Sequence, residues 1–95
     1  MGDDKKFCVQ MRYYEGGMYL FVYDQELIEE EGSIFYKKKV DKKCCGEELA
    51  TLLAKSVSVN LFGARSVRKA VEEGYIHPEG VGEIEGVPTA IFIKT

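Results

Sequence analysis

The feature that most constrains the fold is a pair of apolar runs separated by glycines near the N-terminus. The runs Phe7 to Tyr14 and Met18 to Tyr23 flank Glu15-Gly16-Gly17. Glycine accepts the positive φ angles that a tight turn between two strands requires. The pattern therefore predicts a β-hairpin, in which either Glu15-Gly16 or Gly16-Gly17 forms a two-residue loop.

Both two-residue loops predict the same two faces for this hairpin, because successive side chains of a strand point to opposite sides of the sheet. We interpret the mostly aliphatic face as core: Val9, Met11, Tyr13, Met18, Leu20 and Val22. The opposite face is aromatic and polar: Gln10, Arg12, Tyr14, Tyr19, Phe21 and Tyr23. A three-residue loop would instead turn the second strand over and mix the two sets.

The segment after the hairpin predicts a short helix and then a third strand. In Asp24 to Gly32, Asp24 is a suitable N-cap and Gly32 a suitable C-terminal stop. Ser33 to Val40 begins with β-branched and aromatic residues, which favour a strand.

Two longer helices are expected in the middle of the chain. Glu47 to about Ser58 carries apolar residues at spacings of three and four, which is typical of an amphipathic helix. A second helix is expected from about Leu61 to Glu73, with Asn60 as candidate N-cap and Gly74 after its last turn. In this interpretation the two helices follow each other directly.

Two short apolar runs near the C-terminus predict the closing strands. Val81 to Ile84 and Val87 to Ile93 are joined near Glu85-Gly86. The expected order is about ββ(α)βααββ, an α+β fold with a small mixed or antiparallel sheet. A chain of 95 residues is expected to form one domain over residues 1 to 95, with a loose N-terminus over residues 1 to 6.

The charge balance argues against polyanion binding by the chain as a whole, and the hydropathy argues against a membrane-spanning helix. Thirteen basic and 16 acidic residues give a net charge of −3, so any nucleic-acid role must come from a local patch. The longest apolar run, Met18 to Tyr23, has six residues, whereas a membrane-spanning helix needs about 20. We therefore expect no membrane partner and a cytoplasmic protein.

The strongest site candidate is a basic face on the second predicted helix. Its side chains recur at spacings of three and four and share one side: Arg65, Arg68 and Lys69. Gly63 would let a phosphate or another backbone approach the first turn, where a helix N-terminus attracts anions. A phosphate of RNA is one predicted ligand. The alternative is a solvated face whose cations pair with Glu72 and Glu73.

A second basic feature is a run of lysines around the third predicted strand: Lys37, Lys38, Lys39, Lys42 and Lys43. Successive strand residues point to opposite faces, so the run predicts a charged edge and not one patch. Edge lysines prevent strands of different molecules from pairing. The functional alternative is an edge that follows phosphates, with an affinity that falls as salt rises.

The aromatic face of the hairpin also has two interpretations. Tyrosines beside Arg12 are the residue types that stack on the bases of single-stranded RNA. A helix packed over this face would instead make the tyrosines part of the core.

No spacing of cysteine or histidine predicts catalysis or metal binding. Cys8, Cys44 and Cys45 are interpreted as free thiols. His77 precedes Pro78 and is expected to form a structured turn after the helix. Because neither a zinc-ligand spacing nor a Cys-His or Ser-His-Asp pairing is present, we predict no catalytic residue, no metal and no cofactor.

The C-terminal half resembles a known family. The residues that carry the resemblance are Asn60 to Val67, Ala70, Gly74, Ile76 to Glu79, Val81, Ile84, Gly86 to Pro88, Ala90 and Phe92. They resemble an uncharacterised archaeal family, domain of unknown function 424, over about residues 57 to 93. The hairpin, Asp24 to Leu27 and Glu47 to Leu49 are similar to that family more loosely.

The resemblance implies a small archaeal cytoplasmic protein that is loosely described as RNA-binding. Where the resemblance leads us to expect Pro-His-Ala, the chain has Pro88-Thr89-Ala90. This departure argues against a shared catalytic or metal role for the turn.

Two functional hypotheses follow. The first is a non-enzymatic RNA- or ribosome-associated protein that binds phosphates through Asn60, Gly63, Arg65, Arg68, Lys69, Lys37, Lys39 and His77. The alternative is a protein–protein adaptor, or a homo-oligomeric assembly subunit, that uses the tyrosine-rich sheet face, since aromatic residues are enriched at interfaces. A small-molecule enzyme using His77 or Cys45 has no supporting motif.

Overall fold

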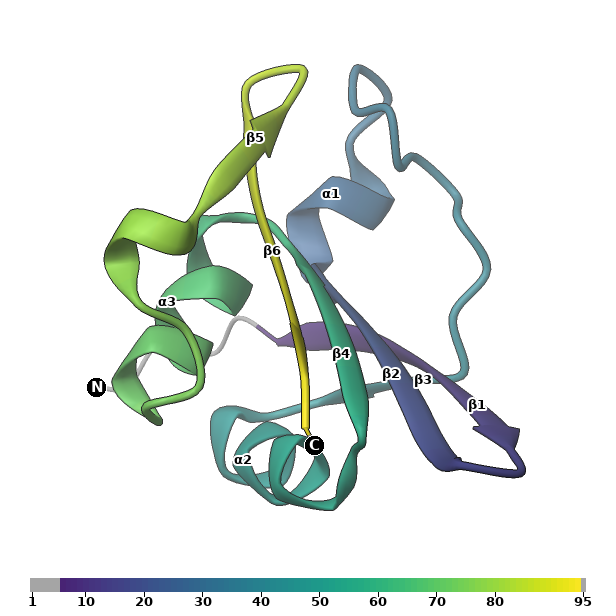
Figure 1. The fold of residues 1–95 in the computed structure, drawn as a ribbon. Coiled ribbons are helices and arrows are strands. Elements are labelled where there is room, and N and C mark those ends of the chain that lie inside the picture. The colour runs from purple at the N-terminus through teal and green to yellow at the C-terminus, as the bar shows by residue number, and fades with distance from the viewer. Residues whose placement is uncertain (1–5, 95) are drawn as a thin grey trace.

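The computed structural model describes residues 6–94, which form a six-stranded mixed sheet with helices (Figure 1). The strands are β1 (Phe7–Tyr14), β2 (Gly17–Asp24), β3 (Lys42–Cys44), β4 (Ser58–Phe62), β5 (Gly82–Ile84) and β6 (Val87–Ile93). The helices are α1 (Gln25–Glu29), α2 (Gly46–Lys55), α3 (Ala64–Glu72) and a 3₁₀ turn, η1 (Pro78–Gly80). The α+β class is confirmed. Except for Lys6, the N-terminus expected to be loose lies outside the described residues.

The N-terminal hairpin forms in the predicted register. Tyr14 lies opposite Gly17, so Glu15-Gly16 is the two-residue loop, and Val9 lies opposite Val22. Gly17 has a φ of 127°, and a Cβ atom placed on it would lie 2.8 Å from a methyl group of Val57. A larger residue is therefore excluded here by both backbone and packing.

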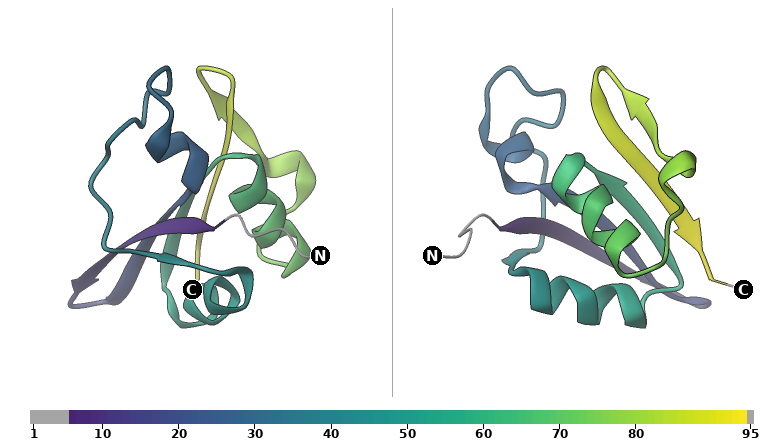
Figure 2. Two further views of the ribbon diagram at one scale, coloured as in Figure 1. Left: turned by 180° about the vertical axis from the view of Figure 1, so that it is seen from behind. Right: turned by 90° about the vertical axis from the view of Figure 1, so that its left-hand side faces the viewer.

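The sheet has the strand order β3-β1-β2-β4-β6-β5, and helices cover one of its faces. Figure 2 shows α2 and α3 side by side on this face. Between helices and sheet lies the core: Phe7, Val9, Met18, Leu20, Val22, Cys44, Leu49, Leu52, Leu53, Val59, Leu61, Val67, Ala70 and Ile76. The predicted core face of the hairpin is confirmed for its four aliphatic members near the centre of the sheet, Val9, Met18, Leu20 and Val22. Met11 is only partly buried, and the prediction was wrong for Tyr13, which is 73% exposed beside the turn. Each fully buried leucine contributes about 1.5–3 kcal/mol relative to an exposed one.

The prediction of a strand over Ser33 to Val40 was wrong, because this segment forms turns and β3 begins only at Lys42. The amide of Tyr36 donates to the carbonyl of Ser33, which closes a turn, and Lys37 has a φ of 60°. Phe35, one of the aromatic residues that favoured a strand, packs its ring against Tyr23 and Phe62 of the sheet.

A strand between the two long helices was not predicted, and it occupies the centre of the sheet. β4 pairs in parallel with β2 and antiparallel with β6. Asn60 is therefore a strand residue, and the predicted N-cap role was wrong. The helix before β4 ends at Lys55, and the helix after it starts at Ala64 with Gly63 as N-cap. Alternation of small polar and branched residues over 56–61 was the signal for this strand.

The C-terminal hairpin is confirmed, and its turn shows why the sequence Glu85-Gly86 occurs there. Both residues have positive φ angles, 52° and 82°, as expected for a two-residue turn between twisted strands. Within residues 6–94, no helix is long and apolar enough to cross a membrane.

Candidate functional site

The N-terminus of α3, where a phosphate was expected, is bound by a carboxylate of the chain itself. Oδ2 of Asp24 accepts from the amide of Arg65 at 3.0 Å, and Oδ1 accepts from the amide and hydroxyl of Ser66, each at 2.7 Å. Asp24 is only 4% exposed. It therefore caps α3 and makes no side-chain cap of α1, contrary to the sequence prediction.

Gly63 is explained by the same contact. Its φ is 110°, and a Cβ atom placed on it would lie 2.5 Å from Oδ2 of Asp24. The open space that sequence reasoning assigned to a phosphate is thus filled by Asp24.

Arg65, the first residue of the predicted basic face, is held inside the protein. Its Nε donates to Glu26 at 3.1 Å, and its Nη2 donates to Glu26 at 2.5 Å and to the carbonyl of Lys6 at 2.9 Å. The guanidinium also lies 4.9 Å from the ring centre of Phe7. Arg65 therefore ties α3 to α1 and β1.

The remaining two cations of that face differ from each other. Lys69 pairs with Glu73 at 3.3 Å, as the alternative interpretation expected, whereas Arg68 is exposed. The structure does not gather Arg65, Arg68 and Lys69 into a free basic patch.

The other face of the sheet, which we call the open face, has no long helix over it. Only α1 and the segment 30–41 lie on this side (Figures 1 and 2). Phe35 from this segment packs against Tyr23 and Phe62, with ring centres 5.5 and 5.0 Å apart. One end of the open face is thereby covered and the rest is accessible.

Aromatic side chains and an arginine occupy the accessible part of the hairpin. Arg12 lies opposite Tyr19, and Gln10 lies opposite Phe21. The rings of Tyr14 and Tyr19 meet edge to face, with centres 5.0 Å apart. Tyr14 is 60% exposed. Tyr23 is buried, but its ring packs against Phe35 of the turn segment and Phe62 of β4, not against a helix. Burial raises the pKa of Tyr23 to about 12.

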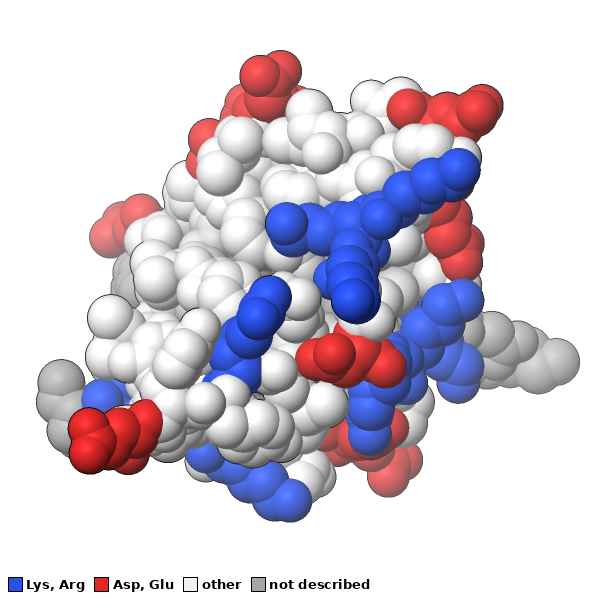
Figure 3. All heavy atoms as spheres, turned by 90° about the vertical axis from the view of Figure 1, so that its right-hand side faces the viewer, with Lys and Arg blue, Asp and Glu red and all other residues white. Residues whose placement is uncertain are grey.

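The five lysines of the run differ in their ion pairing within the described residues. Lys42 pairs with Glu48, and Lys43 pairs with Glu29 at 3.2 Å. Lys37, Lys38 and Lys39 are exposed and form no ion pair with any of residues 6–94. Figure 3 views the molecule from the side of the 30–41 segment and shows basic side chains gathered next to a broad uncharged area.

Arg12 and Lys39 come together at the edge of the open face. With Gln10, Met11 and Asp41 they line a cavity of about 190 Å³. The carboxylate of Asp41 accepts from the amide of Met11 at 2.6 Å, so it completes the β1 edge beyond β3.

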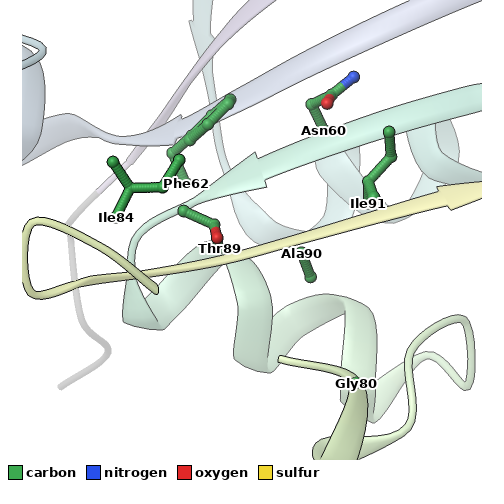
Figure 4. Close-up of a pocket in the computed structure, with 7 residues that line it drawn as sticks. All are labelled: Asn60, Phe62, Gly80, Ile84, Thr89, Ala90 and Ile91. Atoms are coloured by element: carbon green, nitrogen blue, oxygen red, sulfur yellow. The ribbon is translucent and has the colours of Figure 1, made fainter. Parts of the chain in front are cut away.

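A second cavity, which we call the Asn60 pocket, lies on the open face over β4, β5 and β6. Its volume is about 290 Å³, and it is lined by Asn60, Phe62, Gly80, Ile84, Thr89, Ala90 and Ile91. Figure 4 shows the side chains of Asn60, Phe62, Ile84, Thr89 and Ile91 on one side of the sheet, whereas Ala90 points to the other. Thr89, the departure from the expected Pro-His-Ala, is thus part of a pocket.

His77 forms the structured turn expected from the sequence. Its Nδ1 accepts from the amide of Glu79 at 3.1 Å and caps η1, and the side chain is exposed. It lines neither cavity.

The cysteines are free thiols, as predicted. Cys8 and Cys44 are buried, and burial raises both pKa values, that of Cys44 to about 11. Cys45 is exposed at the start of α2. Among the described residues, no group of three or more His, Cys, Asp or Glu side chains is arranged to hold a metal ion.

Comparison with known proteins gives a family and a fold. The model of a family described as "Protein of unknown function (DUF424)" matches residues 22–95. No curated protein matches the chain. The crystal structure of an uncharacterised conserved protein from Methanopyrus kandleri is similar, with a TM-score of 0.74 and 16% identity over 95% of this chain and 94% of that one. At this identity the likeness shows the fold alone.

Proposed function

The chain belongs to the DUF424 family of proteins of unknown function, and we propose that it is a non-enzymatic RNA-binding protein that binds a single strand on the open face. The observation that carries the proposal is the row of aromatic side chains around Arg12, bordered by lysines that form no ion pair with any of residues 6–94. This surface replaces α3, which the sequence favoured.

Aromatic side chains of the hairpin offer surfaces on which bases can stack. Tyr14, Tyr19 and Phe21 project from the open face next to a cation. Each base that stacks on an aromatic side chain contributes about 1–3 kcal/mol to the binding free energy. Every base has a flat ring face, so this stacking does not depend on sequence. Only unpaired bases are free to stack in this way, which favours a single strand over a duplex.

Exposed cations beside these rings can bind the phosphates of the strand. Arg12, Lys37, Lys38 and Lys39 are exposed and form no ion pair within the described residues. Four phosphate contacts would give a slope of log affinity against log salt of about −3 for a single strand. A rise from about 50 to about 200 mM salt would then weaken binding roughly 50-fold.

The test is fluorescence anisotropy of labelled single-stranded RNA with wild type, Arg12→Ala and Arg68→Ala. Both arginines are exposed, but Arg68 lies on α3 and is the matched control. We expect Arg12→Ala to weaken binding and to reduce the salt slope by about 0.7, and Arg68→Ala to change neither. Absence of binding at low salt, or equal effects of the two variants, would refute the proposal.

A second candidate, self-association, is favoured by the free edge of β6. Gly63 donates to the carbonyl of Pro88 and Lys94 donates to that of Val57, so these residues face β4. The intervening residues Ile91 and Ile93 present their backbone outward, beyond the end of β5, and are 57% and 65% exposed. Such edges pair with another strand.

Light scattering coupled to size exclusion tests this candidate. If a second copy pairs along β6, wild type is a dimer and Ile91→Lys is a monomer. A monomeric wild type at every concentration rules the dimer out.

A further inference from the structure

We propose that the Asn60 pocket binds one unstacked nucleobase and that the Asn60 amide reads its edge, with adenine preferred. The inference rests on the proposed RNA binding and adds base selectivity to it.

Asn60 stands in the middle of the open face among apolar neighbours. Across the two strand pairings it lies opposite Phe21 on β2 and Ile91 on β6. Phe62, two residues along β4, points to the same side (Figure 4). An amide is thus surrounded by aromatic and aliphatic side chains.

The side-chain amide of Asn60 forms no hydrogen bond with any of residues 6–94, although the residue is partly buried. Asparagine is depleted in strands, where β-branched and aromatic residues fit better. A residue that disfavours a central strand and makes no side-chain hydrogen bond there is typical of a functional position.

The pocket matches a flat ring in size and lining. Its volume of about 290 Å³ is slightly below the range of drug-sized pockets, about 300–1,000 Å³, and suits a ligand as small as one base. Phe62, Ile84 and Ile91 provide apolar walls, and the Asn60 amide and Thr89 hydroxyl provide polar groups. Apolar walls with few polar groups are typical of sites that orient a ligand.

The chemistry of an amide favours adenine. Its oxygen accepts from the exocyclic amine and its nitrogen donates to the adjacent ring nitrogen, a pairing that is common between asparagine and adenine. Bases of single-stranded RNA that leave the stack are read along such edges. Phe21 lies opposite Asn60, and Tyr19 lies opposite Ser58, so these two rings are next to the pocket strand and can stack the neighbouring bases.

The experiment compares three oligonucleotides: uridine with one central adenosine, uridine throughout, and uridine with a central abasic site. For wild type we expect the adenosine strand to bind about tenfold more tightly than the other two, which corresponds to about 1.4 kcal/mol. If wild type binds all three oligonucleotides with equal affinity, the inference is overturned, and no variant is needed for that result.

Variants identify the residue responsible. Asn60→Leu removes the polar edge and keeps a similar volume, so the adenosine preference disappears while binding to uridine is retained. If Asn60→Leu does not fold, Asn60→Asp, which replaces the donor by a carboxylate, is expected to lose the preference instead. Arg12→Ala is the control: it weakens all three strands by the same factor. A preference that survives both Asn60 variants overturns the inference.

The outcomes separate this inference from the proposed function. RNA that binds without base preference, and more weakly to Arg12→Ala, leaves the proposed function standing and removes base reading. RNA that does not bind at all removes both.

Discussion

Replacing Asp24 by alanine tests the connection between the hairpin and α3. The substitution removes three hydrogen bonds that the carboxylate accepts from Arg65 and Ser66. It leaves two amides and a hydroxyl without partners at a position where Asp24 is buried. The helix also loses a negative charge at its N-terminus, where the helix dipole favours one.

The expected loss follows from these contacts. Three bonds at about 1 kcal/mol net each, plus about 0.5 kcal/mol for the dipole, give about 3–4 kcal/mol. A domain of this size is typically stable by about 5–15 kcal/mol. The melting temperature should therefore fall by about 12 °C or more.

The assay is urea unfolding followed by circular dichroism. Asp41→Ala is the control, because that carboxylate is exposed and accepts one bond, from the amide of Met11. We expect it to cost about 1 kcal/mol. A loss below about 1 kcal/mol for Asp24→Ala, or one equal to that of Asp41→Ala, would refute the capping role.

Two further predictions concern the folded state. Gly63→Ala should cost about 2 kcal/mol or more, because its φ is 110° and the new methyl group meets Asp24. In the double variant with Asp24→Ala this cost should shrink, so additive losses in urea unfolding would contradict the clash. The free energy of unfolding should fall between about pH 9 and about pH 12, because burial raises the pKa values of Cys44 to about 11 and Tyr23 to about 12 from 9.0 and 10.0. The unfolded chain loses these protons first. Tyr23→Phe should therefore remove the fall above about pH 11 and reduce it between about pH 10 and pH 11, where Cys44 still contributes; an unchanged pH profile in that variant would contradict the assignment.

Local patterns predicted the parts of the fold that local physics determines. The hairpin register follows from alternation and a glycine turn, which are encoded within a few residues. The C-terminal hairpin follows in the same way from Glu85-Gly86.

β4 escaped prediction because its sequence satisfies two interpretations. Asn60 and Gly63 are suitable helix-start residues, and the apolar residues before them continue a helical spacing. The segment becomes a strand because it pairs with β2 on one side and β6 on the other. Both partners are remote in sequence, so no local pattern predicts the pairing.

The candidate site moved for a related reason. A basic face at helical spacing was visible in the sequence, but the partners of Arg65 are not. Glu26 and Asp24 lie 39 and 41 residues away in the chain. No local pattern predicts such contacts. The aromatic face around Arg12, by contrast, follows directly from the alternation of side chains in the hairpin.

An NMR titration of the labelled protein with a short single-stranded RNA would locate the RNA-binding surface residue by residue. We expect chemical-shift changes on the open face, at Arg12, Tyr14, Tyr19, Phe21 and Asn60, and little change along α3. Changes confined to α3 around Arg68, or no changes at low salt, would contradict the proposed function.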